Sequence, residues 1–379
     1  MATPAAVARS FNFSWFLQPD AFRIGEPLHH GCKLQNSPLK EKVIVESAKA
    51  LDIGGEGDKF RLNPNRGKIM KIGLALGGGA ARGLAHIGVL QVLEREGIPV
   101  HIIVGCSIGA VIGGVYAQTR SVEAVKEVAD QMLNSEAVKK MGLDFMGEEG
   151  FRLPEDAGLD DIFHYLKLHF SLIKVFNKPY FFDPERVEAL FEPISRARIE
   201  RFPITFAAVA TDLIAAEEVL IQKGPLRDAV QASSAIPGVF PPFEKDDRLL
   251  VDGSSTNTVP AQETRELGAN LVIAVDVSKD IHRIGKLDNA LSILYRVDEI
   301  ASHLLTRQRL HAADVIIRPH VGDVVWADFD RIEELIQKGR DAAEIQLPII
   351  QQMLASPAWS WKRHWQSVRR KLAQWIRTA

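Results

Sequence analysis

The sequence predicts an α/β fold whose functional residues lie on turns that follow buried strands. Short apolar runs, such as Ile72–Leu76 and Val100–Val104, have the composition of strands buried in a sheet. Each of these two runs leads into a glycine-rich turn and then into a longer apolar stretch with helical spacing. Strands that alternate with helices in this way are typical of α/β proteins.

The first turn, Gly77–Gly83, reads GGGAARG and joins a predicted strand at 72–76 to a predicted helix at 84–93, with Leu90 and Leu93 facing the core. Turns of this kind often bind phosphate, but the spacing fits neither the dinucleotide fingerprint nor a P-loop. What the turn offers is a series of backbone N–H groups at a helix start, together with Arg82. These groups suit an oxyanion hole or a site for an anionic headgroup. The alternative is that the turn has no function beyond packing the strand closely against the helix.

The second turn, Gly105–Gly109, has the pattern G-x-S-x-G with Ser107 at its centre. A serine at a sharp strand-to-helix turn has a strained backbone, and glycines two residues away on either side remove side chains that would clash. The start of a helix beneath the serine also favours negative charge. The context therefore favours a nucleophilic serine over a surface serine in an ordinary turn.

The stretch from Gly97 to Thr119 contains no Asp, Glu, Lys or Arg and has the length of a membrane span. Its glycines, its histidine and the interrupting turn favour a core strand followed by a buried helix. We therefore expect no transmembrane segment here.

A nucleophilic serine needs a group that accepts its proton. None of the histidines after Ser107 lies at an obvious strand end beside turn residues. The apolar run Arg248–Val251 instead ends in Asp252 and Gly253, which places a carboxylate at the edge of the sheet. A carboxylate beside a serine acts as a base when partial burial raises its pKa, whereas the alternative is an ordinary Asp-Gly turn.

The remaining predicted elements are strands at 204–210, 271–277 and 315–317, the last at a sheet edge, and helices at 286–311 and 328–354. Residues 120–200 are expected to be mostly helical. Their dispersed aromatic side chains would line a pocket for an acyl chain or pack in a helical core.

The order of these motifs resembles the patatin-like phospholipase family, in its bacterial cytoplasmic type. The GGGAARG turn, the GCSIG turn and the distant Asp-Gly-Ser carry the resemblance, and segments 208–213 and 233–242 extend it over about residues 70 to 320. The resemblance implies a three-layer α/β/α sandwich with a mainly parallel central sheet. It also implies hydrolysis of acyl esters without a metal or other cofactor.

The resemblance further implies that Ser107 is the nucleophile and that Asp252 is the base that activates Ser107 and later a water molecule. It assigns the oxyanion hole to the backbone of Gly77, Gly78, Gly79 and Ala80, with Arg82 nearby for substrate binding. The chain departs from the family pattern at Ala80, where glycine is frequent, and at Ser254, where Gly or Ala usually follows Asp-Gly.

Composition limits the remaining classes of function. A chain of 379 residues holds one large α/β domain with appendages, and a net charge of −2 gives no reason to expect nucleic acid as a partner. The two cysteines, Cys32 and Cys106, form no disulfide framework, and no CxxC or HExxH pattern predicts a metal site. The N-terminus lacks the pattern of a secretory signal, so we expect a cytoplasmic protein.

Four parts are predicted along the chain. They are an N-terminal extension at 1–68, partly disordered, a catalytic domain at 70–325, a helical part packed on the core at 326–356 and a tail at 357–379. The family-like part begins almost at Met70, which suggests a natural or alternative start there.

The tail is basic and rich in tryptophan. From Trp359 onward it contains four of the six tryptophans and six Lys or Arg residues, without an acidic residue. Its apolar residues at helical spacing are Trp361, Trp365, Val368, Leu372 and Trp375. Such a helix suits the interface of a membrane with anionic lipid, which would place the protein on the inner face of the cell membrane. The alternative is a terminal helix docked on the core.

These features predict a serine acyl hydrolase of the phospholipase A, lysophospholipase or esterase type, acting through an acyl-Ser107 intermediate. The alternative is a membrane-associated regulatory or scaffold protein with the same fold and little activity. A nucleotide-binding protein is disfavoured, and no oligomeric state is predicted.

Overall fold

The computed structural model describes residues 70–135, 180–278, 281, 290–321, 324 and 331–355. The predicted extension at 1–68, the tail at 357–379 and the aromatic-rich residues 136–179 lie outside the described residues. The chain separates into two compact units, Met1–Gly67 and Lys68–Ala379, and every described residue belongs to the second unit. The predicted domain limits within that unit remain predictions.

A mixed sheet of eight strands forms the centre of this unit, and its hydrogen-bonded neighbours follow the order β5-β6-β3-β2-β1-β7-β8, with β4 also paired to β3. The strands are β1 (Ile72–Leu76), β2 (Ile102–Cys106), β3 (Thr205–Asp212), β4 (Glu217–Ile221), β5 (Phe243–Lys245), β6 (Arg248–Asp252), β7 (Leu271–Val275) and β8 (Val315–Ile317). The run β3-β2-β1-β7-β8 is parallel, whereas β4 and β6 pair antiparallel with β3, and β5 pairs antiparallel with β6. The sheet is therefore mainly parallel.

Both faces of the sheet are covered, which explains why its central strands are uninterrupted apolar runs. Strands β1, β2 and β7 are buried along their whole length. Leu74 and Leu76 belong to the hydrophobic core on one face, and Ala75 belongs to a separate core on the other. Successive side chains of a strand point to opposite faces, so this division follows from the pleat.

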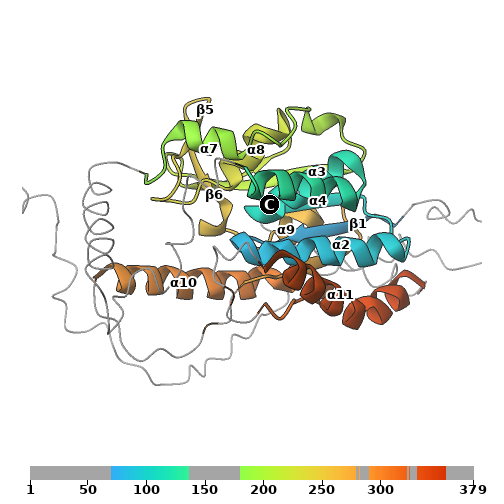
Figure 1. Cartoon of the computed structure of the whole chain (residues 1–379). Coiled ribbons are helices and arrows are strands. Elements are labelled where there is room, and N and C mark those ends of the chain that lie inside the picture. The colour runs from blue at the N-terminus through green and yellow to red at the C-terminus, as the bar shows by residue number, and fades with distance from the viewer. Residues whose placement is uncertain are drawn as a thin grey trace, which may run out of the picture. The chain divides into compact units, whose positions relative to one another are not determined.

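Helices and short 3₁₀ turns provide the two outer layers. They are η3 (Ala80–Leu84), α2 (Ala85–Arg95), α3 (Ile108–Thr119), α4 (Val122–Leu133), α7 (Pro184–Leu190), η6 (Ile199–Arg201), α8 (Leu226–Ser233), η7 (Gly253–Ser255), α9 (Ala261–Glu266), α10 (Ala290–Arg309), η8 (Leu310–Ala312) and α11 (Ile332–Ala355). One face is covered by α2, α3, α8 and α11, and the other by α9 and η8. Figure 1 shows α2 and α11 side by side, with α10 to the left of α11 in this view. The predicted three-layer α/β/α fold is confirmed.

Element limits differ from the predicted ones by a few residues. The second strand spans Ile102–Cys106 instead of Val100–Val104, because Gly105 and Cys106 complete its pairing with β1 and β3. The predicted helix at 286–311 corresponds to α10 followed by η8, and residues 282–289 lie outside the described part. Strand β8 lies at the end of the parallel run, as predicted for an edge strand.

No helix within the described ranges combines the length and the apolar character that a bilayer span requires. The uncharged stretch from Gly97 to Thr119 contains β2 and α3, which are separated by the turn at Ser107.

Candidate active site

The register of the sheet brings Ser107 and Asp252 together. Strand β4 occupies one edge of β3 at residues 208–212, so β2 and β6 share the opposite edge. On that edge Cys106 pairs with Val209, and Asp252 pairs with Ala210, the next residue of β3. Strand β2 runs parallel to β3 and β6 runs antiparallel, so the two strands converge on this point from opposite directions.

Ser107 occupies a strained turn between β2 and α3. Its backbone has φ 52° and ψ −125°, a conformation that costs a residue other than glycine about 1–3 kcal/mol. A Cβ at Gly105 would collide with the Gly109 carbonyl oxygen, and a Cβ at Gly109 would collide with that of Leu76. The glycines of the G-x-S-x-G pattern thus allow close backbone contact on both sides of the serine.

Asp252 ends β6 in a buried position and is 5% exposed. Its Oδ1 accepts a hydrogen bond of 2.8 Å from the Ser254 amide, and the Cys106 thiol lies 3.8 Å from the same oxygen. Burial raises the pKa of Asp252 above its ordinary value of 3.8, while hydrogen bonds from Ser254, Ser107 and Cys106 oppose the rise. The site therefore contains a carboxylate of increased basicity in contact with the side chain of Ser107.

The glycine turn after β1 lies against the serine. A Cβ at Gly78 would be 3.4 Å from the Ser107 Cβ and 2.5 Å from the Ser254 Oγ, so only glycine fits without movement of these groups. The Gly77 amide donates to the Val275 carbonyl and the Gly78 amide to the Thr258 carbonyl, each at 3.0 Å.

The amides of Gly79 and Ala80 form no hydrogen bond with another described residue. Ala80 has φ 47°, which places an alanine in the left-handed region where the family pattern often has glycine. The predicted oxyanion hole of four residues is thereby narrowed to two candidate donors, because the other two amides are already engaged.

The Arg82 side chain forms a hydrogen bond within the Gly77–Gly83 turn. Its Nε donates to the Gly79 carbonyl at 3.2 Å, and its side chain is partly buried. This contact fixes the peptide that follows Gly79. It indicates that Arg82 positions the turn, whereas the predicted role of Arg82 in substrate binding remains a prediction.

Two buried residues at the site were not predicted from the sequence. The Ser233 hydroxyl accepts a hydrogen bond of 2.9 Å from the Ser107 amide and donates one of 2.6 Å to the Val209 carbonyl. His86 Nε2 lies 2.8 Å from the Gly77 carbonyl oxygen, and burial lowers the pKa of His86 to about 4. A neutral imidazole that donates from Nε2 therefore supports the glycine turn. Only a weak signal was available for Ser233, which lies in one of the segments that carry the family resemblance.

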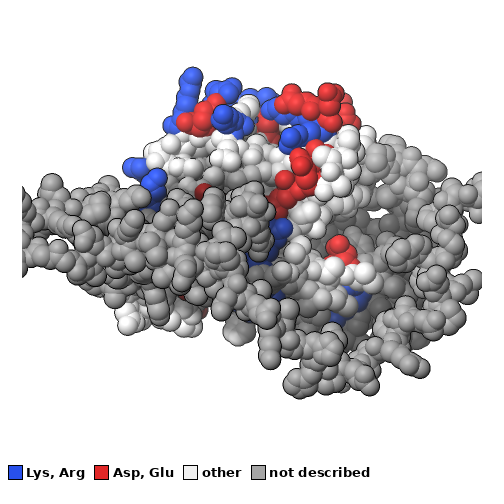
Figure 2. Space-filling model, turned by 180° about the vertical axis from the view of Figure 1, so that it is seen from behind, with Lys and Arg blue, Asp and Glu red and all other residues white. Residues whose placement is uncertain are grey.

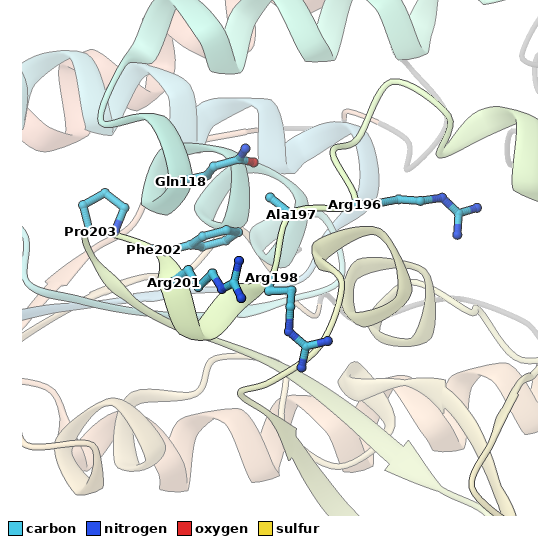
Figure 3. Close-up of a pocket in the computed structure, with 7 residues that line it drawn as sticks. All are labelled: Gln118, Arg196, Ala197, Arg198, Arg201, Phe202 and Pro203. Carbon is cyan, nitrogen blue, oxygen red and sulfur yellow. The ribbon is translucent and has the colours of Figure 1, made fainter.

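A surface pocket of about 440 Å³ lies at the other end of the sheet and is separate from this site. It is lined by Gln118 near the end of α3 and by Arg196–Arg198 and Arg201–Pro203, which precede β3. Ser107 precedes the start of α3, and a helix of this length extends about 18 Å. The guanidinium groups of Arg196, Arg198 and Arg201 point in different directions and do not converge (Figure 3). Glu188 and Glu200 pair with the first two arginines, which further weakens this pocket as an anion site.

Among the residues that the structure describes, no group of three or more His, Cys, Asp and Glu side chains is arranged to hold a metal ion. The polar groups that the structure brings together at the site are the side chains of Ser107 and Asp252 and the neighbouring backbone amides.

The fold and the site together define an α/β protein with a serine at a strained strand-to-helix turn and a buried carboxylate beside it. The model of the patatin-like phospholipases matches residues 74–265, a segment that contains both side chains and the glycine turn. The chain belongs to the patatin-like phospholipase family.

Three relatives illustrate this membership. The chain is 35% identical over 215 residues to an NTE family protein of Mycobacterium tuberculosis, covering 55% of this chain and 49% of the relative. It is 30% identical over 296 residues to a patatin-like phospholipase domain-containing protein of Caenorhabditis elegans, covering 71% and 20%. It is 26% identical over 302 residues to a lysophospholipase of Candida glabrata, covering 73% and 16%. The chain thus spans half or less of the length of these relatives.

Proposed function

We propose that this protein is a serine acyl hydrolase that cleaves acyl esters of lipids through Ser107 and Asp252. The observation that carries the proposal is the convergence of β2 and β6 on one edge of β3, which holds the hydroxyl beside a buried carboxylate. Family membership supports lipid esters as the substrate class, and a relative named as a lysophospholipase makes lysophospholipids the first lipids to test.

In the first half-reaction, Asp252 accepts the hydroxyl proton while the Ser107 Oγ attacks the ester carbonyl carbon. The developing oxyanion would receive hydrogen bonds from the Gly79 and Ala80 amides, and one such donor is worth about 2.7–4 kcal/mol in the transition state. When the tetrahedral intermediate collapses, the ester C–O bond breaks and the leaving alcohol takes the proton from Asp252. The product of this step is acyl-Ser107.

In the second half-reaction, a water molecule attacks the acyl carbonyl and gives a proton to Asp252. The acyl C–O bond to Ser107 then breaks, the free acid leaves, and the proton returns to the Ser107 oxygen. The raised pKa of Asp252 suits this role because it makes the carboxylate a stronger base at both steps.

Hydrolysis of a p-nitrophenyl ester by purified variants tests the proposal. Ser107→Ala and Asp252→Asn are each expected to lose at least about a thousandfold in kcat/KM, because each removes a participant in bond making or proton transfer. Ser234→Ala is the matched control, since the Ser234 hydroxyl is buried near the site without a hydrogen-bond partner among the described residues. A folded Ser107→Ala variant with undiminished activity would overturn the proposal, and an inactive wild type would favour the regulatory or scaffold alternative.

The same mechanism sets the pH dependence. Asp252 must be ionised to act as a base, so kcat/KM should fall as the pH drops through its pKa. Because burial raises that pKa, the fall should be centred above pH 3.8. A profile centred at or below that value would contradict the assignment of Asp252 as the base.

We also propose that the tail at 357–379 holds the protein at an anionic membrane surface, on the cytoplasmic side. Its six basic residues and four tryptophans support this proposal. Removing the tail after residue 356 should weaken binding to anionic vesicles, and unchanged binding would contradict it.

A further inference from the structure

Helix α10 carries an apolar stripe that faces away from the protein. The exposed members are Ile293 (47%), Val297 (59%), Ile300 (41%) and Leu304 (58%). Their spacing of four, three and four residues places them on one side of a helix. A contiguous row of exposed aliphatic side chains indicates a surface that binds a partner, whereas single exposed aliphatic residues are common on protein surfaces.

The opposite side of α10 is polar and lies on the candidate active site. The Ser302 hydroxyl is 3.1 Å from that of Thr258, whose backbone carbonyl accepts the hydrogen bond from the Gly78 amide. Thr306 is 4% exposed, and Arg309 pairs with Glu218 and Glu263 at 2.9 Å. In most surface helices the apolar side faces the protein, whereas in α10 the polar side does. The stripe is therefore only the thickness of one helix, about 10 Å, from the loop beside the glycine turn.

The charges near the stripe match an anionic surface. Arg307 is exposed, lies three residues after Leu304 and therefore beside it on the helix, and forms no ion pair with another described residue. Asp298 is also exposed, but it is not three or four residues from any member of the stripe and so lies away from it. On the same side Arg296 pairs with Glu299, which neutralises that carboxylate. Elsewhere, on the face seen in Figure 2, described basic and acidic side chains lie together along the upper margin without forming a patch of one sign. Exposed apolar side chains beside an exposed arginine suit the interface of a membrane that contains anionic lipid.

A second copy of the chain fits this surface less well. A fully buried aliphatic side chain removes on the order of 100 Å² of apolar surface from water. Four half-exposed side chains therefore bury a few hundred Å² at most, against about 800 Å² per partner in a stable interface.

We propose that the stripe Ile293, Val297, Ile300 and Leu304 on α10 inserts into the interface of an anionic lipid bilayer and holds the Ser107 site at the membrane surface. This inference rests on the proposed lipid hydrolysis for its purpose. The binding itself is measured separately from hydrolysis, so either proposal can fail alone.

The test uses the full chain and vesicles of phosphatidylcholine and phosphatidylglycerol in equal amounts. Ile300→Gln/Leu304→Gln removes two members of the stripe without adding charge and keeps good helix formers. We expect binding in vesicle flotation to weaken about tenfold, with the melting temperature and soluble-ester hydrolysis unchanged. Arg307→Gln should weaken binding and reduce its dependence on salt.

The matched control is Ile345→Gln/Ile349→Gln on α11, which has the same spacing and similar exposure, 72% and 44%. This pair should leave vesicle binding unchanged. Equal loss in both double variants would overturn the assignment to α10, and so would unchanged binding of the α10 variant.

Two further outcomes would overturn the assignment of the stripe to a membrane and would show that something else covers it. A lower melting temperature of Ile300→Gln/Leu304→Gln would show that the stripe packs against another part of this chain, such as the tail. A change from dimer to monomer in light scattering, with vesicle binding unchanged, would show that a second copy covers it.

Discussion

Ser233 supports the backbone of Ser107, the proposed nucleophile, in its strained conformation. Its hydroxyl connects the Ser107 amide to the Val209 carbonyl, and Ser233 is completely buried. Ser233→Ala should therefore leave two buried backbone groups without partners and lower the free energy of unfolding by about 1–3 kcal/mol. Because the turn would relax, kcat should also fall, which combined denaturant unfolding and ester kinetics would show.

The neighbouring serine provides the comparison for this prediction. Ser234 is also buried, but its hydroxyl has no partner among the described residues. Ser234→Ala should change stability and kcat little. If the two variants behaved alike, the hydrogen bonds of Ser233 would not support the turn.

His86 should make the protein sensitive to acid. Burial lowers the pKa of His86 in the folded state to about 4, from 6.5, so the unfolded state binds the proton more tightly. The free energy of unfolding should therefore decline as the pH falls from about 6.5 to about 4, by roughly 3 kcal/mol at 1.36 kcal/mol per pKa unit. Unfolding in urea across this range measures the decline.

His86→Gln is the informative variant because its amide N–H can still reach the Gly77 carbonyl but does not titrate. Its stability should vary less with pH between 6.5 and 4 than that of the wild type. Parallel profiles for the two proteins would place the acid sensitivity elsewhere.

The two residues of the proposed dyad could be identified from local sequence, whereas the residues that hold them in position could not. Ser107 and Asp252 each follow a recognisable strand and stand beside glycine, so the turn chemistry is visible in the sequence. Ser233 and His86 act through hydrogen bonds to residues that depend on strand register and helix placement. The engagement of the Gly77 and Gly78 amides likewise depends on loops that arrive from distant parts of the chain.

At the scale of elements, α2 and α11 approach so closely that glycine is required on both. A Cβ at Gly339 would collide with the Ala85 carbonyl oxygen, and a Cβ at Gly88 with that of Ile336. Alanine normally stabilises a helix by about 1 kcal/mol relative to glycine. If replacing one of these glycines by alanine destabilises the protein, the loss therefore comes from the collision between α2 and α11. Gly339→Ala should lower the free energy of unfolding by about 1–3 kcal/mol, as measured in urea.

Gly113→Ala in α3 is the control for this contact. Its Cβ would meet side-chain atoms of Ile103, Leu76 and Phe206, at 2.7, 3.0 and 3.7 Å, and side chains can shift more easily than backbone. We expect a smaller loss than for Gly339→Ala. An equal or larger loss at Gly113 would show that backbone contact does not limit the approach of α11.

The elements themselves followed closely from hydrophobic pattern, and their ends did not. Apolar runs gave β1, β2 and β7 because both faces of the sheet are covered. The predicted strand at 100–104 ends two residues before β2 does, because Gly105 and Cys106 resemble turn residues. The register with β1 and β3 keeps both residues in the strand. The antiparallel pairing of β6, which turns Asp252 towards Ser107, has no signal in local sequence.

At the scale of the whole molecule, the described core lies entirely within Met70–Ala355. Strand β1 begins at Ile72, and both of its edges are paired with described strands, one with β2 and the other with β7. A chain that starts at Met70 should therefore keep its melting temperature within a few degrees and retain ester hydrolysis, as calorimetry and the p-nitrophenyl assay would show. Loss of folding in this shortened chain would mean that residues 1–69 are needed by the core.

The most direct test of the central claim is labelling with a fluorophosphonate, which forms a stable adduct with an activated serine, followed by peptide mass spectrometry. We predict one adduct on Ser107, no adduct in Ser107→Ala and much slower labelling in Asp252→Asn. Labelling at another residue, or an unchanged rate in Asp252→Asn, would contradict a nucleophile at Ser107 activated by Asp252.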